Sequence, residues 1–474
     1  MKDVIYRFRP IEKLLHDDGI TGELDSLYIY FAGREQLNDP LEGYADFFFE
    51  GDEIAWNNLL KNYLQCLSNH CTLLALGQVD SYDLSRNILG IAANAPPGVV
   101  EIWNETYDLF MAEPTVAKFV SAWCLLGKAH RSELFSYLDT IHFYAADVIT
   151  QTLSKRRLLP KVPARDEKKH AYRLERVRLF TEVLSNSNLD LAAKKEMMDV
   201  HVRYNKESSL LNRFQNRHRE ISQTQLEMIA FPDKYCNALE KSVYPEWYVA
   251  CFMEECDDSS IWGTYGRNHT AVCLEFYVEK TTNAEGITLT RPNSIGSKGV
   301  GWGADIMPLK AVSYGKDFAS VDFFNSLGSL NEDSVLKYWL GNAEKQLSSR
   351  AKDITENQEE WRLNYWKNFD HTATVKISHW KKEREYRLIQ HSTIFDLTDT
   401  KLRKLNFEFS SLKGIVFGIN TSVGDKLKLM AKIEILCKEH KRKDFHFYQA
   451  RYDHHTKKIA RDHLSKINVG FSRE

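Results

Sequence analysis

Hydrophobic and polar residues alternate in short segments at both ends of the chain. In residues 4–9, Val4, Tyr6 and Phe8 occupy alternate positions, which predicts a strand with these three side chains on one face. Alternation also predicts a strand at 272–277, and short segments of strand character predict further strands at 27–31, 247–252, 306–314, 384–389, 412–417 and 445–448. The predicted strands therefore fall into two groups, one near the N-terminus and one in the second half of the chain.

The stretch between these two groups has helical spacing instead. Helices are predicted over 54–67, 115–126, 132–152 and 172–184. Strands at both ends with a helical block between them predict an α+β fold, with a mixed or antiparallel sheet core built from the N- and C-terminal segments. The expected organisation is a core of 1–50 and 245–450, a large α-helical insertion at 51–244 and a polar tail at 451–474.

Composition and charge narrow the class of protein. Lys plus Arg total 63 and Asp plus Glu total 65 of the 474 residues, so the net charge of −2 gives no general electrostatic reason to bind nucleic acid or an anionic membrane. No segment approaches the roughly 20 consecutive apolar residues of a transmembrane helix, and residues 1–9 lack the apolar stretch of a secretory signal. The 8 Cys are scattered without a Cys-x-x-Cys pair, which favours reduced thiols and a cytoplasmic location.

Several common catalytic motifs are missing from the sequence. No Gly-x-Gly-x-x-Gly follows a predicted strand and no Gly-x-x-x-x-Gly-Lys-Ser/Thr loop is present, so neither common type of nucleotide fold has its phosphate-binding loop. His-Glu-x-x-His, paired Cys/His zinc spacing and Gly-x-Ser-x-Gly are also absent. The sequence therefore predicts no metal site of these types.

Residues 37–42 (Leu-Asn-Asp-Pro-Leu-Glu) predict a rigid turn. Proline restricts its own φ angle and favours an extended conformation at Asp39, so the side chain of Glu42 leaves the turn in a defined direction. As a binding site, the turn presents Asn38, Asp39 and Glu42. As a purely structural turn, it uses Asn38 and Asp39 to cap backbone groups.

Residues 262–269 (Trp-Gly-Thr-Tyr-Gly-Arg-Asn-His) place aromatic residues directly before a predicted strand. Trp262 and Tyr265 are three residues apart and so fall on the same side of a helical turn, with His269 at the start of the strand. The pattern suits a pocket wall with a stacking tyrosine. It also suits a packed core in which Trp262 is buried, the Tyr265 hydroxyl is hydrogen-bonded and His269 caps the strand.

Residues 379–389 (His-Trp-Lys-Lys-Glu-Arg-Glu-Tyr-Arg-Leu-Ile) contain a third candidate group. In a strand, Glu383, Glu385 and Arg387 point to one surface, while Tyr386 and Leu388 point to the core. Two carboxylates this close shift each other's pKa and can act in acid–base catalysis or stabilise a cation. The structural alternative is a salt ladder in which Arg387 neutralises Glu385.

Taken together and in this order, these segments resemble a widespread bacterial family of domains of unknown function. That family is recognised by an LNDPxE turn, a WxxY…NHxGxCLxF block and a WxxExEYR strand, which correspond here to residues 37–42, 262–276 and 380–387. The resemblance covers roughly 1–50 and 245–450 and leaves out the helical block. Thr270-Ala271 after the histidine and Met253 after Cys-Phe depart from the family pattern.

The residue order is also similar to that of ADP-ribosyltransferases. In those enzymes a first-strand Arg or His holds NAD, a Tyr or Ser orients the nicotinamide side, and a late Glu engages the ribose and stabilises the transition state. The similarity implies NAD as substrate, with Glu385, Glu383 and Tyr265 as the catalytic residues. The residues that it implies for NAD binding and the acceptor side are Arg7, Tyr6, Trp262, His269, Asn38, Asp39, Glu42 and Arg387.

The first functional hypothesis is therefore an intracellular bacterial transferase or glycohydrolase that uses NAD, acting as a toxin or anti-phage effector. Its macromolecular target, a nucleic acid or protein, would bind the helical insertion, and no membrane is expected to take part. All enzyme hypotheses require Arg7 and Glu385 to share one cavity with Trp262 and Tyr265.

Three alternatives remain open, of which the simplest is that the segments 262–265 and 383–385 serve structure alone. Another is a nucleotide-binding or protein-interaction module without catalysis, in which the helical block is an interaction arm. The third is a metal-dependent nuclease, whose metal would be held by Asp39, Glu42, His269, Glu383 and Glu385.

Overall fold

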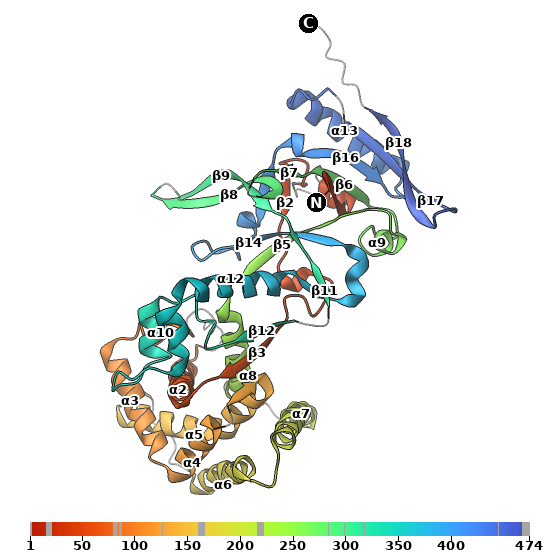
Figure 1. Ribbon diagram of the computed structural model, residues 1–474. Coiled ribbons are helices and arrows are strands. Elements are labelled where there is room, and N and C mark those ends of the chain that lie inside the picture. Colours follow the sequence, from red (N-terminus) through yellow and green to blue (C-terminus); the bar gives the residue numbers. More distant parts are fainter. Residues whose placement is uncertain are drawn as a thin grey trace. The chain divides into compact units, whose positions relative to one another are not determined.

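The computed structural model describes residues 2–15, 21–78, 84, 88–125, 127–159, 166–215, 222–282, 284–297, 299–315, 318–443 and 445–466. The chain forms two compact units, each drawn from separate stretches of the sequence. Unit 1 comprises Met1–Tyr44, Glu246–Ala319 and Asp370–Glu474, and unit 2 comprises Ala45–Pro245 and Ser320–Phe369. Sheets dominate unit 1 and helices dominate unit 2 (Figure 1), which confirms the predicted α+β class.

Unit 1 is built around an eight-stranded sheet that joins both ends of the chain. Its strand order is β10 (Lys310–Ala311), β14 (Glu385–His391), β5 (Trp247–Met253), β1 (Val4–Arg9), β6 (Val272–Tyr277), β16 (Leu412–Phe417), β17 (His446–Asp453) and β18 (Lys458–Lys466). Neighbouring strands are antiparallel except β16 and β17, which are parallel and connected through helix α13 (Val423–Glu439). The N-terminal strand β1 thus pairs with strands from the second half of the chain, as predicted.

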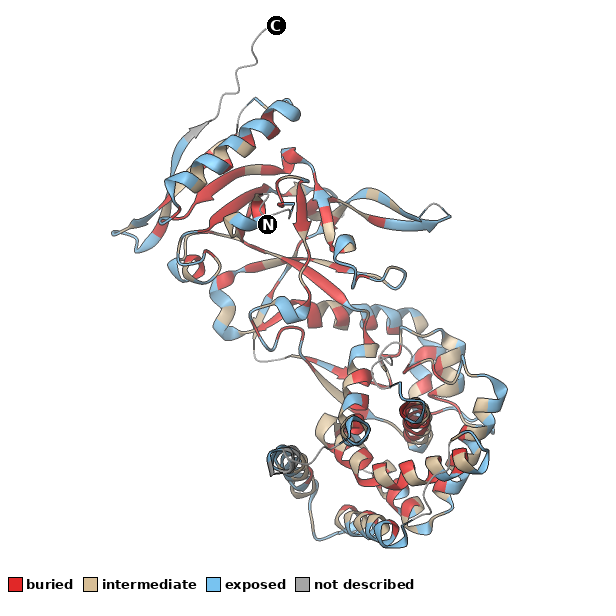
Figure 2. Ribbon diagram, turned by 180° about the vertical axis from the view of Figure 1, so that it is seen from behind, coloured by how far each residue is buried: buried red, intermediate tan, exposed pale blue. Residues whose placement is uncertain are grey.

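One face of this sheet packs against a second sheet and α13. The second sheet contains β2 (Tyr28–Tyr30), β15 (Lys404–Phe407), β8 (Glu285–Gly296) and β7 (Glu279–Lys280), with β9 (Gly299–Pro308) paired to β8. Leu274, Leu405 and Ile433, one from each layer, belong to the main hydrophobic core, and the central strands are largely buried (Figure 2). The opposite face of the eight-stranded sheet carries a smaller core that contains Tyr6 and Trp262.

Short elements complete unit 1. They are α1 (Ile11–Leu14), η1 (Arg34–Gln36), α9 (Ser259–Thr264), β11 (Ser313–Gly315), β13 (Val375–Ile377), η4 (Ser378–Glu383), η5 (Thr400–Arg403) and η6 (Phe409–Ser411). Strands β11 and β13 form a separate parallel pair. This small pair supplies one of the charged residues of the candidate site.

Unit 2 is mainly helical. Its main helices are α2 (Glu53–Ala75), α3 (Pro97–Met111), α4 (Pro114–Cys124), α5 (Arg131–Lys155), α6 (Glu167–Ser185), α7 (Leu191–Gln215), α8 (Gln223–Val243), α10 (Glu332–Tyr338), α11 (Lys352–Glu356) and α12 (Gln358–Thr374). A small sheet joins β12 (Ala319–Asp322), β3 (Ala45–Glu50) and β4 (Lys128–His130). Within the described ranges, no helix is long and apolar enough to cross a membrane.

The units differ from the predicted boundaries in two places. Residues 320–369, predicted as core, belong to the helical unit because their aromatic side chains pack there, with Phe323 5.0 Å from Phe49 and Phe324 5.6 Å from Trp56 between ring centres. The tail predicted from residue 451 instead contributes to β17 and β18. The polar composition of this segment gives no hydrophobic pattern from which strand β18 could be predicted. In β18, Ile459 packs in the smaller core, and backbone hydrogen bonds to β17 hold the rest of the strand.

The core of unit 2 contains a neutral histidine, His142 of α5. It is fully buried, its Nδ1 accepts the Tyr63 hydroxyl at 2.8 Å, and its Nε2 donates to the carbonyl of Met228 at 2.8 Å. Burial lowers the pKa of His142 to about 4. The folded unit therefore holds this ring in its uncharged form at neutral pH.

Acid should consequently destabilise the protein. An unfolded histidine has a pKa of about 6.5, so the contribution of His142 is fully present above that pH and is lost as the pH falls towards 4. We expect the free energy of unfolding to fall by about 2 kcal/mol between pH 6.5 and pH 5 from this group. Urea denaturation at several pH values measures the effect, and equal pH slopes for wild type and His142→Gln would contradict it.

Candidate functional site

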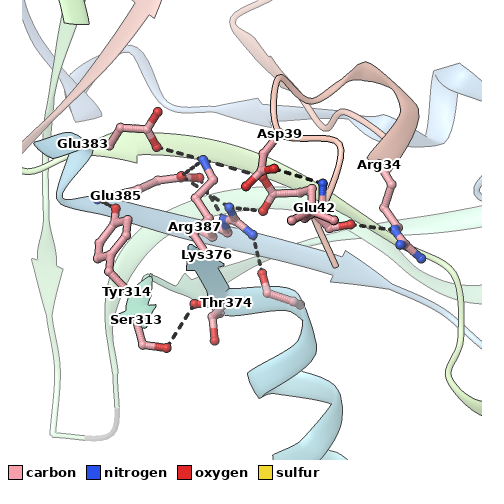
Figure 3. A network of polar contacts seen from close by, with 12 residues as sticks. Arg34, Asp39, Glu42, Ser313, Tyr314, Thr374, Lys376, Glu383, Glu385 and Arg387 are labelled. Atoms are coloured by element: carbon pink, nitrogen blue, oxygen red, sulfur yellow. Dashed lines mark hydrogen bonds and ion pairs between the residues drawn. The ribbon is translucent and has the colours of Figure 1, made fainter. Parts of the chain in front are cut away.

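A buried network of charged side chains lies beside strand β14 in unit 1 (Figure 3). At its centre, Lys376 Nζ lies 2.7 Å from Glu385 Oε2, 2.8 Å from Glu383 Oε2 and 3.6 Å from Glu42 Oε2. Arg387 is the second cation: its Nε lies 2.8 Å from Glu385 Oε1, and its Nη2 pairs with Glu42. Because all five side chains are buried, two cations hold three carboxylates away from solvent.

The turn at residues 37–42 brings Glu42 into this network. Asp39 closes the turn, since its Oδ1 accepts the backbone N–H of Leu41 at 2.9 Å and its carbonyl accepts that of Glu42 at 3.0 Å. Gly43 follows with φ 63°, and a Cβ there would lie 2.4 Å from the ring of Trp247, so only glycine fits. The turn has the capping role predicted for Asp39, and Glu42 points into the network.

Glu383 and Glu385 reach the same lysine because the chain turns between them. Glu383 ends the 3₁₀ helix η4, and β14 begins at Glu385. Arg384 between them adopts a left-handed conformation with φ 44°. The prediction that Glu383 belongs to the strand is therefore wrong, because the 3₁₀ turn directs this side chain. Glu385 and Arg387 pair with each other as in the structural alternative, and both are buried, with Lys376 covering Glu385.

Lys376 comes from a short strand that the hydrophobic pattern does not reveal. The parallel pairing of β13 with β11 sets Lys376 opposite Tyr314, whose hydroxyl accepts the backbone N–H of Glu385 at 2.7 Å. The signal in the sequence is a lone lysine between Val375 and Ile377 directly after a helical stretch. It is weak, because the three carboxylates that require a lysine there come from other segments.

The network pushes the pKa values of its carboxyl groups apart. Burial alone would raise the pKa of Glu385, but the charges of Arg387 and Lys376 outweigh it and lower the pKa to about 2. Burial raises the pKa of Glu383, and the negative charge of Glu385 adds to this effect although Lys376 opposes it. Burial likewise raises the pKa of Glu42. Such separation is typical of sites in which one carboxyl holds its charge while another exchanges a proton.

The network carries more acidic than basic groups. Glu42, Glu383 and Glu385 face two cations, so one negative charge remains when all five groups are ionised. On the turn that carries Glu42, Asp39 is also buried, and Arg34 donates its Nε to the carbonyl of Glu42 at 3.1 Å. Asp39 Oδ2 is buried without a hydrogen-bond partner in the described structure. An acidic excess of this kind favours the binding of a proton or a cation.

Aromatic side chains stand between the network and solvent. The Tyr265 hydroxyl donates to Glu383 Oε1 at 2.5 Å, and the centre of the Trp380 ring lies 5.4 Å from Lys376 Nζ. Both rings are only partly buried, unlike the charged groups that they contact. The network therefore contacts side chains that are partly exposed, although its own charged groups are buried.

Arg7 does not belong to the network, contrary to the prediction. Tyr6 lies opposite Met253 on β5, and Met253 lies opposite Glu385 on β14, so these three residues share a face of the sheet. Arg7, next along β1, points to the other face, where it donates to the carbonyl of Tyr30 at 3.0 Å. The predicted cavity shared by Arg7 and Glu385 is therefore wrong.

Four other predicted residues lie outside the network. Trp262 is fully buried, and the ring of His269 stacks on it with 6.2 Å between ring centres, as in the packed-core alternative. Tyr6 shares a face with Glu385, but its hydroxyl donates to Glu275 Oε1 at 3.3 Å. Asn38 is exposed on the turn. The structure thus brings together Glu42, Glu383, Glu385, Arg387 and Tyr265. It places Asp39 beside them on the turn at 37–42 and separates the other predicted residues from them.

The ligand set predicted for a nuclease is not assembled. No group of three or more His, Cys, Asp or Glu side chains is placed to hold a metal ion in the ranges that the structure describes. The ammonium group of Lys376 lies among the three carboxylates instead, and His269 packs on Trp262.

A known family matches the part of the chain that carries most of the network. The sequence model of a family described as protein of unknown function (DUF2971) matches residues 261–388. This match confirms the predicted resemblance to an uncharacterised domain family, and it includes Tyr265, Lys376 and the segment 383–387. No curated protein and no solved structure matches the chain significantly.

Proposed function

We propose that the chain is an enzyme that breaks the bond between nicotinamide and ribose in NAD, as a glycohydrolase or as an ADP-ribosyltransferase, but at a site other than the predicted one. The cavity that the enzyme hypotheses required of Arg7, Trp262 and Glu385 is not formed, so the proposal keeps none of the roles that the residue order gave to Arg7 and Trp262 and rests on the charged network alone. The observation that carries this proposal is the different hydrogen bonding of the two carboxyl groups: Tyr265 and Lys376 hold Glu383, whereas Lys376 and Arg387 occupy both oxygens of Glu385. Glu385 keeps its negative charge, whereas Glu383, held by Tyr265 and Lys376, is the carboxyl group suited to proton exchange.

The charge of the network supports a cationic substrate. The nicotinamide ring of NAD is positively charged, and its ribose gains positive charge as the glycosidic bond breaks. Surplus carboxylates stabilise such charge, most strongly where water is excluded. The partly buried rings of Tyr265 and Trp380 provide aromatic faces for the nicotinamide.

The proposed roles of individual residues follow from their burial. Glu383 is the proposed catalytic carboxylate because it contacts a ring that solvent reaches, and Tyr265 orients it. Glu385 is proposed to position Lys376 and Arg387, since its own oxygens are occupied by them. Arg7 has no part in this proposal, because its side chain lies on the opposite face of the sheet.

A nucleotide-binding role without catalysis is the second candidate. The depth of the network favours it, since Glu42, Glu383 and Glu385 are each no more than 3 % exposed. In that case the network holds β14, β13 and η4 together, and a ligand contacts only the surrounding aromatic rings.

The test is to incubate the purified full-length chain with NAD labelled in its adenylate part, alone and with bacterial lysate as a source of acceptors. We expect nicotinamide release, measured by chromatography, and labelled macromolecules if the chain is a transferase. Intact NAD that nevertheless binds, measured by calorimetry, would replace the first candidate with the second. If NAD is neither turned over nor bound, the result contradicts both candidate functions.

A further inference from the structure

Unit 1 has a surface pocket of about 390 Å³ that shares no lining residue with the charged network. Its walls come from helix α1, from the turn that precedes β6, and from the first two turns of α13. Three segments that are far apart in the sequence therefore converge on it. The volume lies in the range of pockets that bind small molecules.

The pocket combines an apolar floor with a charged rim. Ile11 and Leu15 form part of the floor and also pack against the main core. On the rim, Arg267 pairs with Glu12. Lys428 on α13 lines the same pocket and makes no ion pair or hydrogen bond with any described residue. The lining therefore holds one cation that has no partner among the described residues, a second that pairs with Glu12, and a further carboxylate, Asp425.

The backbone holds Arg267 at the rim against its usual preference. Arg267, Asn268 and His269 have φ angles of 48°, 52° and 66°, a run of three residues in the left-handed conformation that side chains other than glycine disfavour. Asn420 holds this turn by donating its N–H to the carbonyl of His269 at 2.9 Å and its Nδ2 to that of Asn268 at 3.1 Å. Strained turns of this kind persist where the surrounding structure enforces them, often around a bound ligand.

We propose that this pocket binds a nucleoside monophosphate. Its phosphate would meet Lys428 and Arg267, the two cations of the rim. The ribose hydroxyls would donate to the carboxylates of Glu12 and Asp425, which also line the pocket. The base would lie on the apolar floor formed by Ile11 and Leu15.

Calorimetry with AMP, adenosine and inorganic phosphate as separate probes tests this inference on the full chain. AMP should bind more tightly than either fragment, and Lys428→Met should weaken AMP binding about tenfold. Lys438→Met is the matched control, because Lys438 is on the same helix, pairs with Glu434 and does not line the pocket.

Three outcomes would overturn the inference: no binding of AMP, AMP binding no tighter than phosphate, or equal loss in Lys428→Met and Lys438→Met. Circular dichroism of each variant shows whether it is folded. Glu383 does not line this pocket, so Glu383→Gln should bind AMP as tightly as the wild type does. Loss of AMP binding and loss of NAD turnover can therefore be distinguished.

Discussion

Replacing Arg387 with methionine is expected to lower the free energy of unfolding by about 3–5 kcal/mol. Arg387 is fully buried, contacts Glu385 and Glu42, and donates Nη1 to the carbonyl of Ala373 at 2.6 Å. Its removal leaves buried carboxylates without the cation that compensates their loss of hydration. Urea denaturation of the full chain, followed by circular dichroism, measures the change.

Arg384→Met is the matched control for this experiment. Arg384 is three residues away, its side chain is 52 % exposed, and it pairs with Glu255 near solvent. Its loss should cost less than about 1 kcal/mol. If Arg387→Met does not accumulate as folded protein, Arg387→Lys replaces it in the experiment. Lysine keeps the charge but not the planar guanidinium group, so the free energy of unfolding of Arg387→Lys should lie between those expected for Arg387→Met and Arg384→Met. Equal stability of Arg387→Met and Arg384→Met would contradict the structural role of the network.

Replacing Glu383 with glutamine is expected to lower the turnover of NAD by at least about 100-fold. The amide still accepts the Tyr265 hydroxyl but neither exchanges a proton nor stabilises a cation. Lys376 keeps Glu385 as a partner at 2.7 Å, so the variant should lose much less stability than Arg387→Met. Nicotinamide release at saturating NAD and urea denaturation together separate the chemical effect from the structural one.

Glu408→Gln, which replaces an exposed carboxylate in the same unit, serves as the control and should leave turnover unchanged.

Glu385→Gln differs from Glu383→Gln in its expected outcome. Because Glu385 binds both Arg387 and Lys376, its neutralisation should reduce stability as well as activity. Unchanged turnover in Glu383→Gln would remove Glu383 from the catalytic role, and the network would then be a structural element.

The α+β class could be predicted because strand alternation and helical spacing are local properties of the chain. Strands close to 4–9 and 272–277 follow from period-2 alternation, and a strand at 412–417 follows from its largely apolar segment. All three lie in the eight-stranded sheet. The rigid turn at 37–42 could also be predicted from the sequence, because Pro40 restricts its own backbone and that of Asp39.

The assignment of Arg7 to the site failed for a physical reason. Both faces of β1 are buried, so alternation distinguishes two sets of side chains but does not say which set faces the candidate site. The second sheet and α13 cover one face, and Trp262 packs on the other. Those partners come from distant parts of the chain, so only the tertiary structure sets Arg7 apart from Glu385.

The sequence by itself determined the kinds of local element and the residues able to carry charge chemistry, because backbone preference and side-chain type depend on neighbours in the chain. Only the tertiary structure decided which of those residues meet. Lys376 reaches Glu42, Glu383 and Glu385 through the pairing of β13 with β11, the 3₁₀ turn η4 and the turn at 37–42. The interaction of these charges, and with it the separation of their pKa values, depends on distances of a few ångströms between segments far apart in the sequence.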